Sequence, residues 1–484
     1  MSEDSNRVIK GDVAVIGGGL AGLTCGIGLR NSGLKVIMLE RNEMLGGRAR
    51  GWIDTETGDP VDIGPHIFLS EYPNTLKLLD ILGTRENIAW QTDQFITMVK
   101  GRHRIKIKMA PLPPPFHFVP SVFADSTIPH RDKLSNLSVT WRAMQIDEEE
   151  VLQLDAINAY DFLRNAGVSE QYINTFWAFV SMSIMNVPVD QCSAGALMRF
   201  YRHLIGHNKY YIGFPKSGLD NIFAVRAREV LEASGVQFLM NTTASGFVAD
   251  MNSITRLETT AGLGIEAKMY VSTLAPQDLR QIARSEWLDR HSVFANLESF
   301  LPCPYISSYI WFDRKLTREQ FWARAYSPVD LNCDFYDLTN INHGLRDRPS
   351  IIASNIIYSH RANNLSDVEI ISATVRELEE FLPEVSTAKV LHKVVNRIPM
   401  AIHCPHPGTE RKRPETHTPL DNLFLAGDWT QTCIPPSMES AVRSGWLAAE
   451  RVLERAGNPQ NLAVQVKETE GIAGLVRRIG KWLA

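Results

Sequence analysis

A glycine-rich turn near the start of the chain has the spacing that dinucleotide binding requires. The short apolar run 12–16 is followed at once by Gly17, Gly19, Ala21 and Gly22, and then by a helical pattern. Gly17 permits a tight turn, Gly19 lets the backbone approach a pyrophosphate, and Gly22 lets the helix pack closely on the strand. Because helix N-termini attract phosphate, the segment predicts a strand, a turn and a helix that hold a dinucleotide.

An acidic residue and two arginines follow this turn at positions that suit contacts with a dinucleotide. A second apolar strand, 35–39, ends in Glu40, where a carboxylate can accept hydrogen bonds from ribose hydroxyls. Arg41 comes next, and Gly47 and Arg48 follow in a Gly-Gly-Arg turn. The amides of such a turn and a planar guanidinium suit a second phosphate or a flavin ring. These residues therefore favour FAD over NAD.

Two further segments have residue types that suit contact with a flavin. Gly64, Pro65 and His66 interrupt an apolar strand, and such a break lets the backbone approach a flat ring. Far downstream, another strand ends just before Asp428, and a long helix follows with Met438 in its first turn. We expect Asp428 to bind a ribityl hydroxyl or the pyrophosphate, and the positive end of the helix to face the flavin. The alternative role of Asp428 is that of a simple helix cap.

The candidate residues come from both ends of the chain, so the elements that position them must form a discontinuous domain. We expect an α/β fold with a Rossmann-type, glutathione-reductase-like FAD-binding domain, interwoven with an α+β substrate domain. The expected FAD-binding domain comprises residues 1–75, 211–285 and 418–456. The expected substrate domain comprises 76–210 and 286–417, and an amphipathic tail spans 457–484.

Composition and charge exclude several classes of protein. The chain has 484 residues, with 50 basic and 54 acidic side chains and a formal net charge of −4. A strongly basic nucleic-acid binder is therefore excluded, and nucleic acid is not an expected partner. The six cysteines form no C-x-x-C pair, which indicates a reducing compartment and no zinc ribbon. His203 and His207 are four residues apart but lack a third ligand, so we expect no metal.

Together these motifs resemble those of the FAD-dependent amine oxidase superfamily, in the branch of phytoene and carotene desaturases and their squalene-pathway relatives. The segments 66–74, 309–316 and 392–399 are similar to plant and cyanobacterial phytoene desaturases in particular. After Asp428, however, the chain continues with Trp429 and Thr430, which is more similar to hydroxysqualene dehydroxylases.

The resemblance implies hydride transfer between a flavin and a carbon of a long apolar isoprenoid. Phytoene or carotene desaturation is the leading interpretation, hydroxysqualene dehydroxylation the alternative, and oxidation of a polar amine a second alternative. A prenyl-binding module without redox chemistry is disfavoured by the intact fingerprint. The resemblance also implies that the backbone of Ala244 touches the adenine, and that His66 and Trp429 lie near the isoalloxazine. Quinone or oxygen would accept the electrons.

Two apolar segments bear on where the protein works. The proline-rich, aromatic stretch 110–123 is expected to be non-helical and to form a lipid-facing mouth. At the C-terminus, one helical stripe is apolar and the opposite face basic, either as an interfacial helix or as a helix docked on the body. The apolar stripe consists of Ile472, Leu475, Val476, Ile479, Trp482 and Leu483. We expect a cytoplasmic protein that lies peripherally on the inner face of a membrane.

Overall fold

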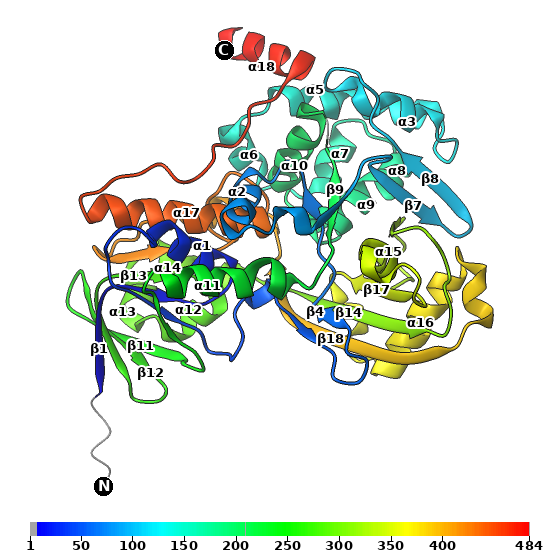
Figure 1. Cartoon of the computed structure of the whole chain (residues 1–484). Helices are drawn as coiled ribbons and strands as arrows, with labels where there is room; N and C mark the ends of the chain where they lie inside the picture. Colours follow the sequence, from blue (N-terminus) through cyan, green and yellow to red (C-terminus); the bar gives the residue numbers. More distant parts are fainter. Residues whose placement is uncertain (1–6, 209, 484) are drawn as a thin grey trace.

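A parallel sheet holds the N-terminal strand of the computed structural model, which describes residues 7–208 and 210–483 (Figure 1). Its parallel strands run in the order β10-β2-β1-β13, and β19 also pairs with β13. They span Gln237–Leu239 (β10), Val36–Leu39 (β2), Val8–Ile16 (β1), Gly264–Ser272 (β13) and Leu423–Leu425 (β19). Two antiparallel strands, β11 (Ala244–Ala249) and β12 (Ile254–Thr259), extend the sheet. The expected strand 35–39 is therefore present, as β2.

Helices cover the parallel strands on both faces, because β2 and the second half of β1, residues 13–16, consist of apolar residues that must leave water. Helix α1 (Leu20–Leu29) lies against α17 (Met438–Arg455) (Figure 1). Gly445 makes this close approach possible, since a Cβ there would lie 2.4 Å from the carbonyl oxygen of Ala21. The helix expected after the strand that precedes Asp428 is thus confirmed. Small residues such as Gly445 allow it to pack closely against α1.

The carboxyl ends of the parallel strands meet at one edge of this sheet. Gly17 follows β1, Glu40 follows β2, Thr273 follows β13 and Ala426 follows β19. The chain proceeds from β1 to β2 on one side, whereas β13 lies on the other side of β1. Open α/β sheets bind ligands at such a reversal of strand order. The two ends of the chain are therefore brought to one site.

A second, mostly antiparallel sheet has the strand order β18-β14-β17-β16-β15-β7-β8. The strands span Val390–His403 (β18), Pro302–Phe312 (β14), Ile351–Ile356 (β17), Asp334–Asp337 (β16), Phe321–Arg324 (β15), Ile96–Lys100 (β7) and His103–Ile107 (β8). Helix α16 (Asp367–Glu379) covers one face. A capping box begins this helix, with Ser366 as the N-cap residue and Glu369 as its partner.

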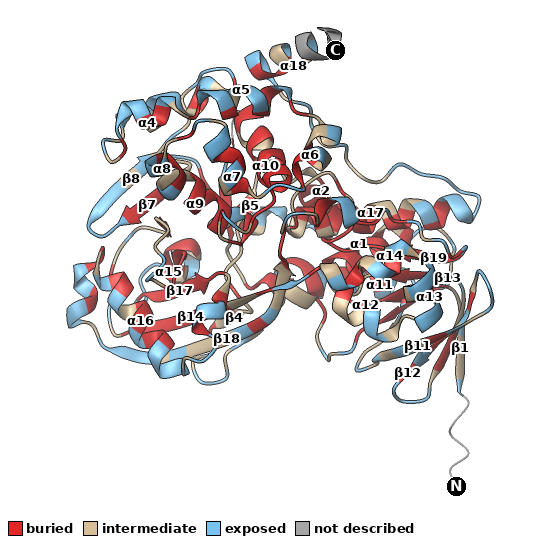
Figure 2. Ribbon diagram, turned by 180° about the vertical axis from the view of Figure 1, so that it is seen from behind, coloured by how far each residue is buried: buried red, intermediate tan, exposed pale blue. Residues whose placement is uncertain are grey.

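A group of helices packs against the other face of the second sheet, and buried apolar residues fill the space between them. It includes α5 (Leu137–Gln145), α7 (Ala159–Asn165) and α10 (Ala194–Gly206), of which α10 is largely buried (Figure 2). Short strands link this region to the first sheet: β3 (Gly51–Ile53) with β4 (Pro60–Asp62), and β5 (Phe68–Leu69) with β9 (Ile212–Pro215) and β6 (Ile88–Gln91).

The structure differs from expectation in the proline-rich stretch and at one predicted boundary. Residues Val119–Ala124 form helix α3, which tolerates Pro120 because that residue lies in the first turn, where its missing amide is not needed. The boundary expected after residue 75 falls inside α2 (Pro73–Leu82), whose apolar residues join the core around α1. The division into domains therefore stays a prediction.

The C-terminal helix α18 (Gly471–Leu483) lies beside α5 at the rim of the molecule (Figure 1). Ala473 faces the body, whereas Ile472 and Leu475 are exposed. The side chains of Ile479, Trp482 and Leu483 lie outside the described residues. Among the helices that the structure describes, none is long and apolar enough to span a bilayer.

Candidate functional site

A cavity of about 1190 Å³ begins at the carboxyl edge of the parallel sheet and continues between the second sheet and its helices. It exceeds the roughly 300–1,000 Å³ of an ordinary ligand pocket, so it can hold a cofactor and a substrate together. All but one of the predicted cofactor-binding residues line it. These are Gly17, Gly19, Ala21, Glu40, Arg41, Gly47, Arg48, Gly64, Pro65, His66, Ala244, Asp428 and Met438.

Glycines line the part of the cavity between the first strand and its helix. Gly17 has a φ of 110°, and a Cβ there would lie 2.6 Å from Thr273 Oγ1. A Cβ on Gly47 would lie 3.1 Å from the Cα of Gly19. Gly22 does not line the cavity but packs behind it. A Cβ added to Gly22 would lie 2.0 Å from the carbonyl oxygen of Gly17. A wall of bare backbone at a helix N-terminus fits the pyrophosphate of FAD.

Glu40 lies at the edge of this glycine wall. It is 6 % exposed, and its carboxylate accepts hydrogen bonds from Gly18 N at 2.8 Å and from Asn42 N at 2.9 Å. Ala244 lines the cavity in the segment that follows β10, where Thr242 N donates to the backbone oxygen of Glu40. These contacts fix the carboxylate where the predicted ribose interaction requires it, and place Ala244 beside it. Both roles remain predictions.

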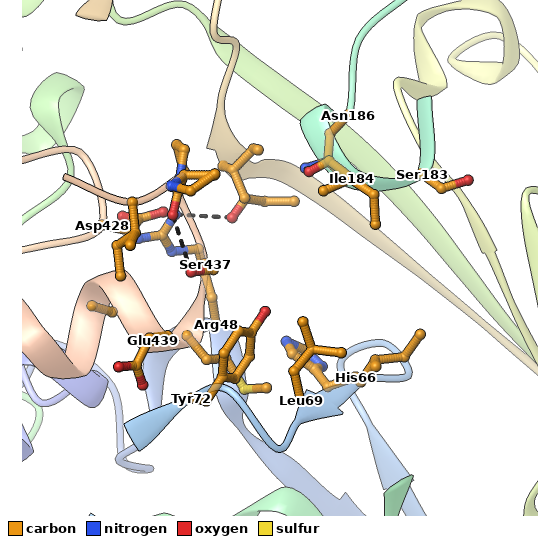
Figure 3. Close-up of a pocket in the computed structure, with 18 of the residues that line it drawn as sticks. Arg48, His66, Leu69, Tyr72, Ser183, Ile184, Asn186, Asp428, Ser437 and Glu439 are labelled. Carbon is orange, nitrogen blue, oxygen red and sulfur yellow. Dashed lines mark hydrogen bonds and ion pairs between the residues drawn. The ribbon is translucent and has the colours of Figure 1, made fainter. Parts of the chain in front are cut away.

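Arg48 and Asp428 form a bidentate ion pair between segments that are 380 residues apart in sequence. Arg48 donates to Asp428 at 2.6 and 3.1 Å, and to the carbonyl oxygen of Ala401 at 2.9 Å (Figure 3). Burial alone would raise the pKa of Asp428, but the guanidinium of Arg48 outweighs that effect and holds the pKa below its usual value. Asp428 is therefore a charged group in the cavity wall and not a simple helix cap.

Replacing Arg48 with lysine is expected to weaken flavin binding about tenfold, because an ammonium cannot reproduce the planar fork that holds both oxygens of Asp428. The measurement is the dissociation constant from quenching of free-flavin fluorescence. Arg85→Lys is the matched control, since Arg85 pairs with Asp80 on the open surface. Equal affinities of Arg48→Lys and Arg85→Lys would show that the fork is unimportant.

The Gly64-Pro65-His66 segment is held against the second sheet. Asn355 Nδ2 donates to the carbonyl oxygen of Pro65 at 3.3 Å, and a Cβ on Gly64 would lie 3.3 Å from Asn355 Oδ1. His66 Nδ1 lies 2.7 Å from the carbonyl oxygen of Gly64. Burial lowers the pKa of His66, and Arg48 adds to the effect, so the imidazole is neutral and donates through Nδ1.

The N-terminus of α17 also borders the cavity. Ser437 caps this helix by accepting from Ser440 N, and both Ser437 and Met438 line the cavity. Tyr72 and His66 lie on one side of the opening, and Ile184 and Asn186 on the other (Figure 3). A helix of 18 residues directs partial positive charge to this point. That this charge faces the flavin stays a prediction.

A buried arginine that the sequence pattern did not reveal organises the loop between Asp428 and α17. Arg413 donates to the carbonyl oxygens of Asp428, Thr430 and Ile434 at 3.1, 2.7 and 2.9 Å. Its charge is paired with Glu410, and both side chains are fully buried. Burial would raise the pKa of Glu410, but Arg413 and Arg199 lower it to about 2. The flavin-side loop is therefore fixed by an ion pair beneath it.

Trp429 lies away from the cavity, whereas Arg41 and Thr273 line it. Trp429 does not line the cavity, because its Nε1 donates to the carbonyl oxygen of Leu274 and its ring packs on Phe300 in a separate core. The expectation that it lies near the isoalloxazine is therefore wrong. Arg41 lines the cavity and pairs with Asp278 at 3.2 Å. Thr273 could have been predicted, since it follows a parallel strand of the same sheet.

Metal ligands do not gather in the part of the chain that the structure describes. No group of three or more histidine, cysteine or acidic side chains there could hold an ion. His203 and His207 stack with their ring centroids 6.3 Å apart, and both line the cavity. Burial lowers the pKa of both, so they are neutral polar groups in its wall.

Comparison with protein families identifies one that covers most of the chain. The family model described as flavin-containing amine oxidoreductase matches residues 20–453. Among solved structures, putrescine oxidase bound to putrescine is 15 % identical with a TM-score of 0.70, and covers 93 % of this chain and 100 % of its own. A putative protoporphyrinogen oxidase from Exiguobacterium sp. is 16 % identical with a TM-score of 0.68, covering 94 % and 100 %. These structures share the fold.

Curated sequences are similar over nearly the same length. The 15-cis-phytoene desaturase of Synechococcus elongatus is 27 % identical and covers 92 % of this chain and 96 % of its own. The chloroplastic/chromoplastic 15-cis-phytoene desaturase of Solanum lycopersicum is 28 % identical, covering 92 % and 78 %. A probable zeta-carotene desaturase of Synechococcus elongatus is 23 % identical, covering 91 % and 98 %.

Proposed function

Since the chain belongs to the family of flavin-containing amine oxidoreductases and is an FAD-dependent oxidoreductase, we propose that it transfers hydride between FAD and a carbon of a long apolar isoprenoid. Phytoene or carotene desaturation is the leading reaction, in keeping with the names of the similar curated proteins. Dehydroxylation of a squalene alcohol uses the same placement of a substrate carbon and is the second candidate.

The continuity of the cavity is the observation that carries the proposal. From the flavin-side residues it runs into a space walled by aromatic and aliphatic side chains of the second sheet and the helices. These include Met98, Tyr172, Phe176, Phe179, Val180, Phe200, Phe321 and Ala323. Such a wall is mostly apolar and suits a hydrocarbon chain.

The residues around the flavin side prepare this site for hydride transfer. FAD, when bound, exchanges hydride with a carbon of the substrate. The N-terminus of α17 and the guanidinium of Arg48 supply positive charge beside the position expected for the ring. His66, held neutral by burial and by its bond to Gly64, closes the other side without adding charge. The apolar wall then fixes which carbon of the chain lies against the flavin.

The test is conversion in cells that supply the substrate. The protein is expressed in one host that accumulates phytoene and in another that accumulates hydroxysqualene, and the apolar metabolites are extracted from each. New conjugated carotenes would establish desaturation, and loss of hydroxysqualene with gain of squalene would establish dehydroxylation. A purified flavoprotein that changes neither extract and oxidises a polar amine would refute the proposal.

We propose that the open end of the cavity lies against a membrane. The membrane would supply the apolar substrate and a quinone as electron acceptor. Oxygen is the alternative acceptor. Exposed apolar side chains surround this end, and we call them the mouth patch. The mouth patch consists of Leu112, Phe116, Val119, Phe123, Leu134, Leu137 and Trp141, with Ile472 and Leu475 of α18 nearby. Four of these residues also line the cavity. An apolar rim around a cavity entrance is typical of a lipid contact.

Introducing charge into the mouth patch is expected to lower binding to lipid vesicles about tenfold or more. Leu137 and Trp141, which are 60 % and 53 % exposed, are replaced together by aspartate, because burying an acid in lipid is unfavourable. Sedimentation with phosphatidylethanolamine–phosphatidylglycerol vesicles measures the bound fraction. Met251→Asp with Val329→Asp is the control pair, since these residues are more exposed but lie elsewhere. Equal loss in both pairs would refute a localised contact.

A further inference from the structure

The imidazole of His66 is held in one orientation and one tautomer. Its Nδ1 lies 2.7 Å from the carbonyl oxygen of Gly64, and because a carbonyl only accepts hydrogen bonds, the ring proton is on Nδ1. Burial lowers the pKa of His66, and the charge of Arg48 adds to the effect, so the ring takes up no second proton near neutral pH. Nε2 therefore has a free lone pair.

This lone pair is open to the cavity. His66 is half-buried and lines the cavity wall, opposite Ile184 and Asn186 (Figure 3). Among the described residues none is hydrogen-bonded to Nε2, and this nitrogen is not one of the unpartnered polar atoms that are sealed inside the protein. A bound ligand can therefore reach it.

The carboxylates beside the N-terminus of α17 are occupied by contrast. Arg48 binds both oxygens of Asp428, at 2.6 and 3.1 Å. The two oxygens of Glu439 accept four hydrogen bonds from Asn74 and Thr75, at 2.8 to 3.0 Å. A carboxylate held in this way is a poor acceptor for a further proton. His66 differs from both in having an acceptor atom that no neighbouring group uses.

A desaturation needs such an acceptor. Forming a C=C bond removes a hydride from one carbon and a proton from the next. FAD, when bound, takes the hydride. The carbon that loses it becomes positively charged, which makes the C–H bonds of its neighbour strongly acidic. The group that accepts the proton must therefore be close and unoccupied, but it does not need to be a strong base.

We propose that Nε2 of His66 accepts the proton that leaves the hydrocarbon during desaturation, which makes His66 a catalytic residue. The inference rests on the proposed function and specifies its leading reaction. The electron pair of the broken C–H bond becomes the second bond of the new C=C, and the ring becomes an imidazolium. Since Arg48 and burial both disfavour the imidazolium, the ring readily releases the proton to solvent before the next turnover.

The same tautomer is unsuited to the dehydroxylation of a squalene alcohol. A hydroxyl group leaves a carbon as water only after it has received a proton, and Nε2 of the neutral ring has none to give. The proton on Nδ1 is engaged with the carbonyl oxygen of Gly64. His66 therefore distinguishes between the two candidate reactions, and it favours the desaturation.

The tautomer can be measured without turnover. Full-length protein with 15N-labelled histidine is loaded with FAD, and the ring nitrogens are observed by NMR at pH 7. His66 should give the signals of a neutral ring with its proton on Nδ1, and His66→Asn identifies these signals by their loss. A proton on Nε2, alone or together with Nδ1, would overturn the inference, because Nε2 then has no lone pair.

A single anaerobic turnover tests the catalytic role, with phytoene as the probe and loss of flavin absorbance as the signal. His66→Asn keeps an N–H donor at the position of Nδ1 for Gly64 but lacks Nε2. We expect unchanged FAD affinity, and flavin reduction about a hundredfold or more slower than in the wild type. His417→Asn is the matched control, since His417 is exposed and pairs with Glu415 on the surface, and it should react like the wild type.

Added imidazole separates a catalytic role from a structural one. His66→Ala leaves a space of the size of the ring, so imidazole in solution should restore flavin reduction in this variant. It should not do so in His66→Phe, where the new ring fills the space. A wild-type rate in His66→Asn, or a slow His66→Ala that imidazole does not rescue, would overturn the inference and leave the proposed function intact. A wild-type protein whose flavin phytoene does not reduce would refute desaturation itself, and the inference with it.

Discussion

Replacing Gly22 with alanine is expected to abolish FAD binding, with an affinity at least a hundredfold below that of the wild type. The added Cβ would lie 2.0 Å from the carbonyl oxygen of Gly17, a contact that no real structure contains. That carbonyl is held in place, because Gly17 N donates to Leu39 O at 2.8 Å and Thr273 Oγ1 donates to the carbonyl oxygen itself at 3.1 Å. The helix must therefore move away from the strand, and its N-terminus leaves the pyrophosphate position.

The measurement is the ratio of flavin to protein absorbance after gel filtration in excess FAD. Gly26→Ala is the control in the same helix, since its Cβ would meet the end of the flexible Met38 side chain at 2.8 Å and not a backbone atom. This control should retain flavin. Stoichiometric FAD in Gly22→Ala would show that the glycine wall is not where the pyrophosphate binds.

Replacing Arg413 with methionine should destabilise the protein by about 3–5 kcal/mol, the usual cost of leaving a buried charge without its partner. The variant leaves Glu410 with Arg199 alone, and deprives the carbonyls of Asp428, Thr430 and Ile434 of a donor. Methionine fills much of the same volume, so the loss is electrostatic and not a cavity effect. The loop beside the flavin should loosen, and FAD affinity should fall with stability.

Thermal unfolding with and without FAD measures both effects. Arg411→Met is the matched control, because Arg411 is exposed and lies two residues away. Its stability should change by less than about 1 kcal/mol. If Arg413→Met lowers stability but leaves FAD affinity and the flavin spectrum unchanged, then Arg413 supports the fold without positioning the flavin-side loop.

Sequence reasoning accounts best for the residues of the glycine-rich turn, which the structure brings to one wall of the cavity, and their contacts with FAD stay predictions. Gly17, Gly19 and Glu40 belong to a local pattern in which strand, turn and helix follow one another directly, so spacing alone places them. Asp428 was also placed correctly in the cavity, because the strand before it and the helix after it have clear apolar patterns. For the glycine-rich turn and for Asp428, the local order of strand, turn and helix was sufficient to predict that these residues lie together.

The substrate end could not be predicted in the same way. Phe321 and Ala323 line the cavity only because β15 lies between β7 and β16, and no local pattern specifies that order. Arg413 lies in an irregular segment whose importance depends on contacts with a loop that follows it in sequence. Trp429 points away from the cavity because residues 427–430 form a turn, in which Thr430 N donates to Gly427 O at 3.1 Å, and this turn directs the indole ring to Leu274 and Phe300.

The parallel sheet also constrains how the protein is made. Its strands are synthesised at widely separated times, because β1 ends at residue 16, β13 ends at residue 272 and β19 begins only at residue 423. At typical rates of translation, about 5–20 residues per second, the edge of β13 waits roughly ten to thirty seconds for its partner. An unpaired apolar strand is prone to aggregate during this interval. Production of soluble protein should therefore respond to slower synthesis and to chaperones that bind nascent chains, since added cofactor cannot act before β19 has been synthesised.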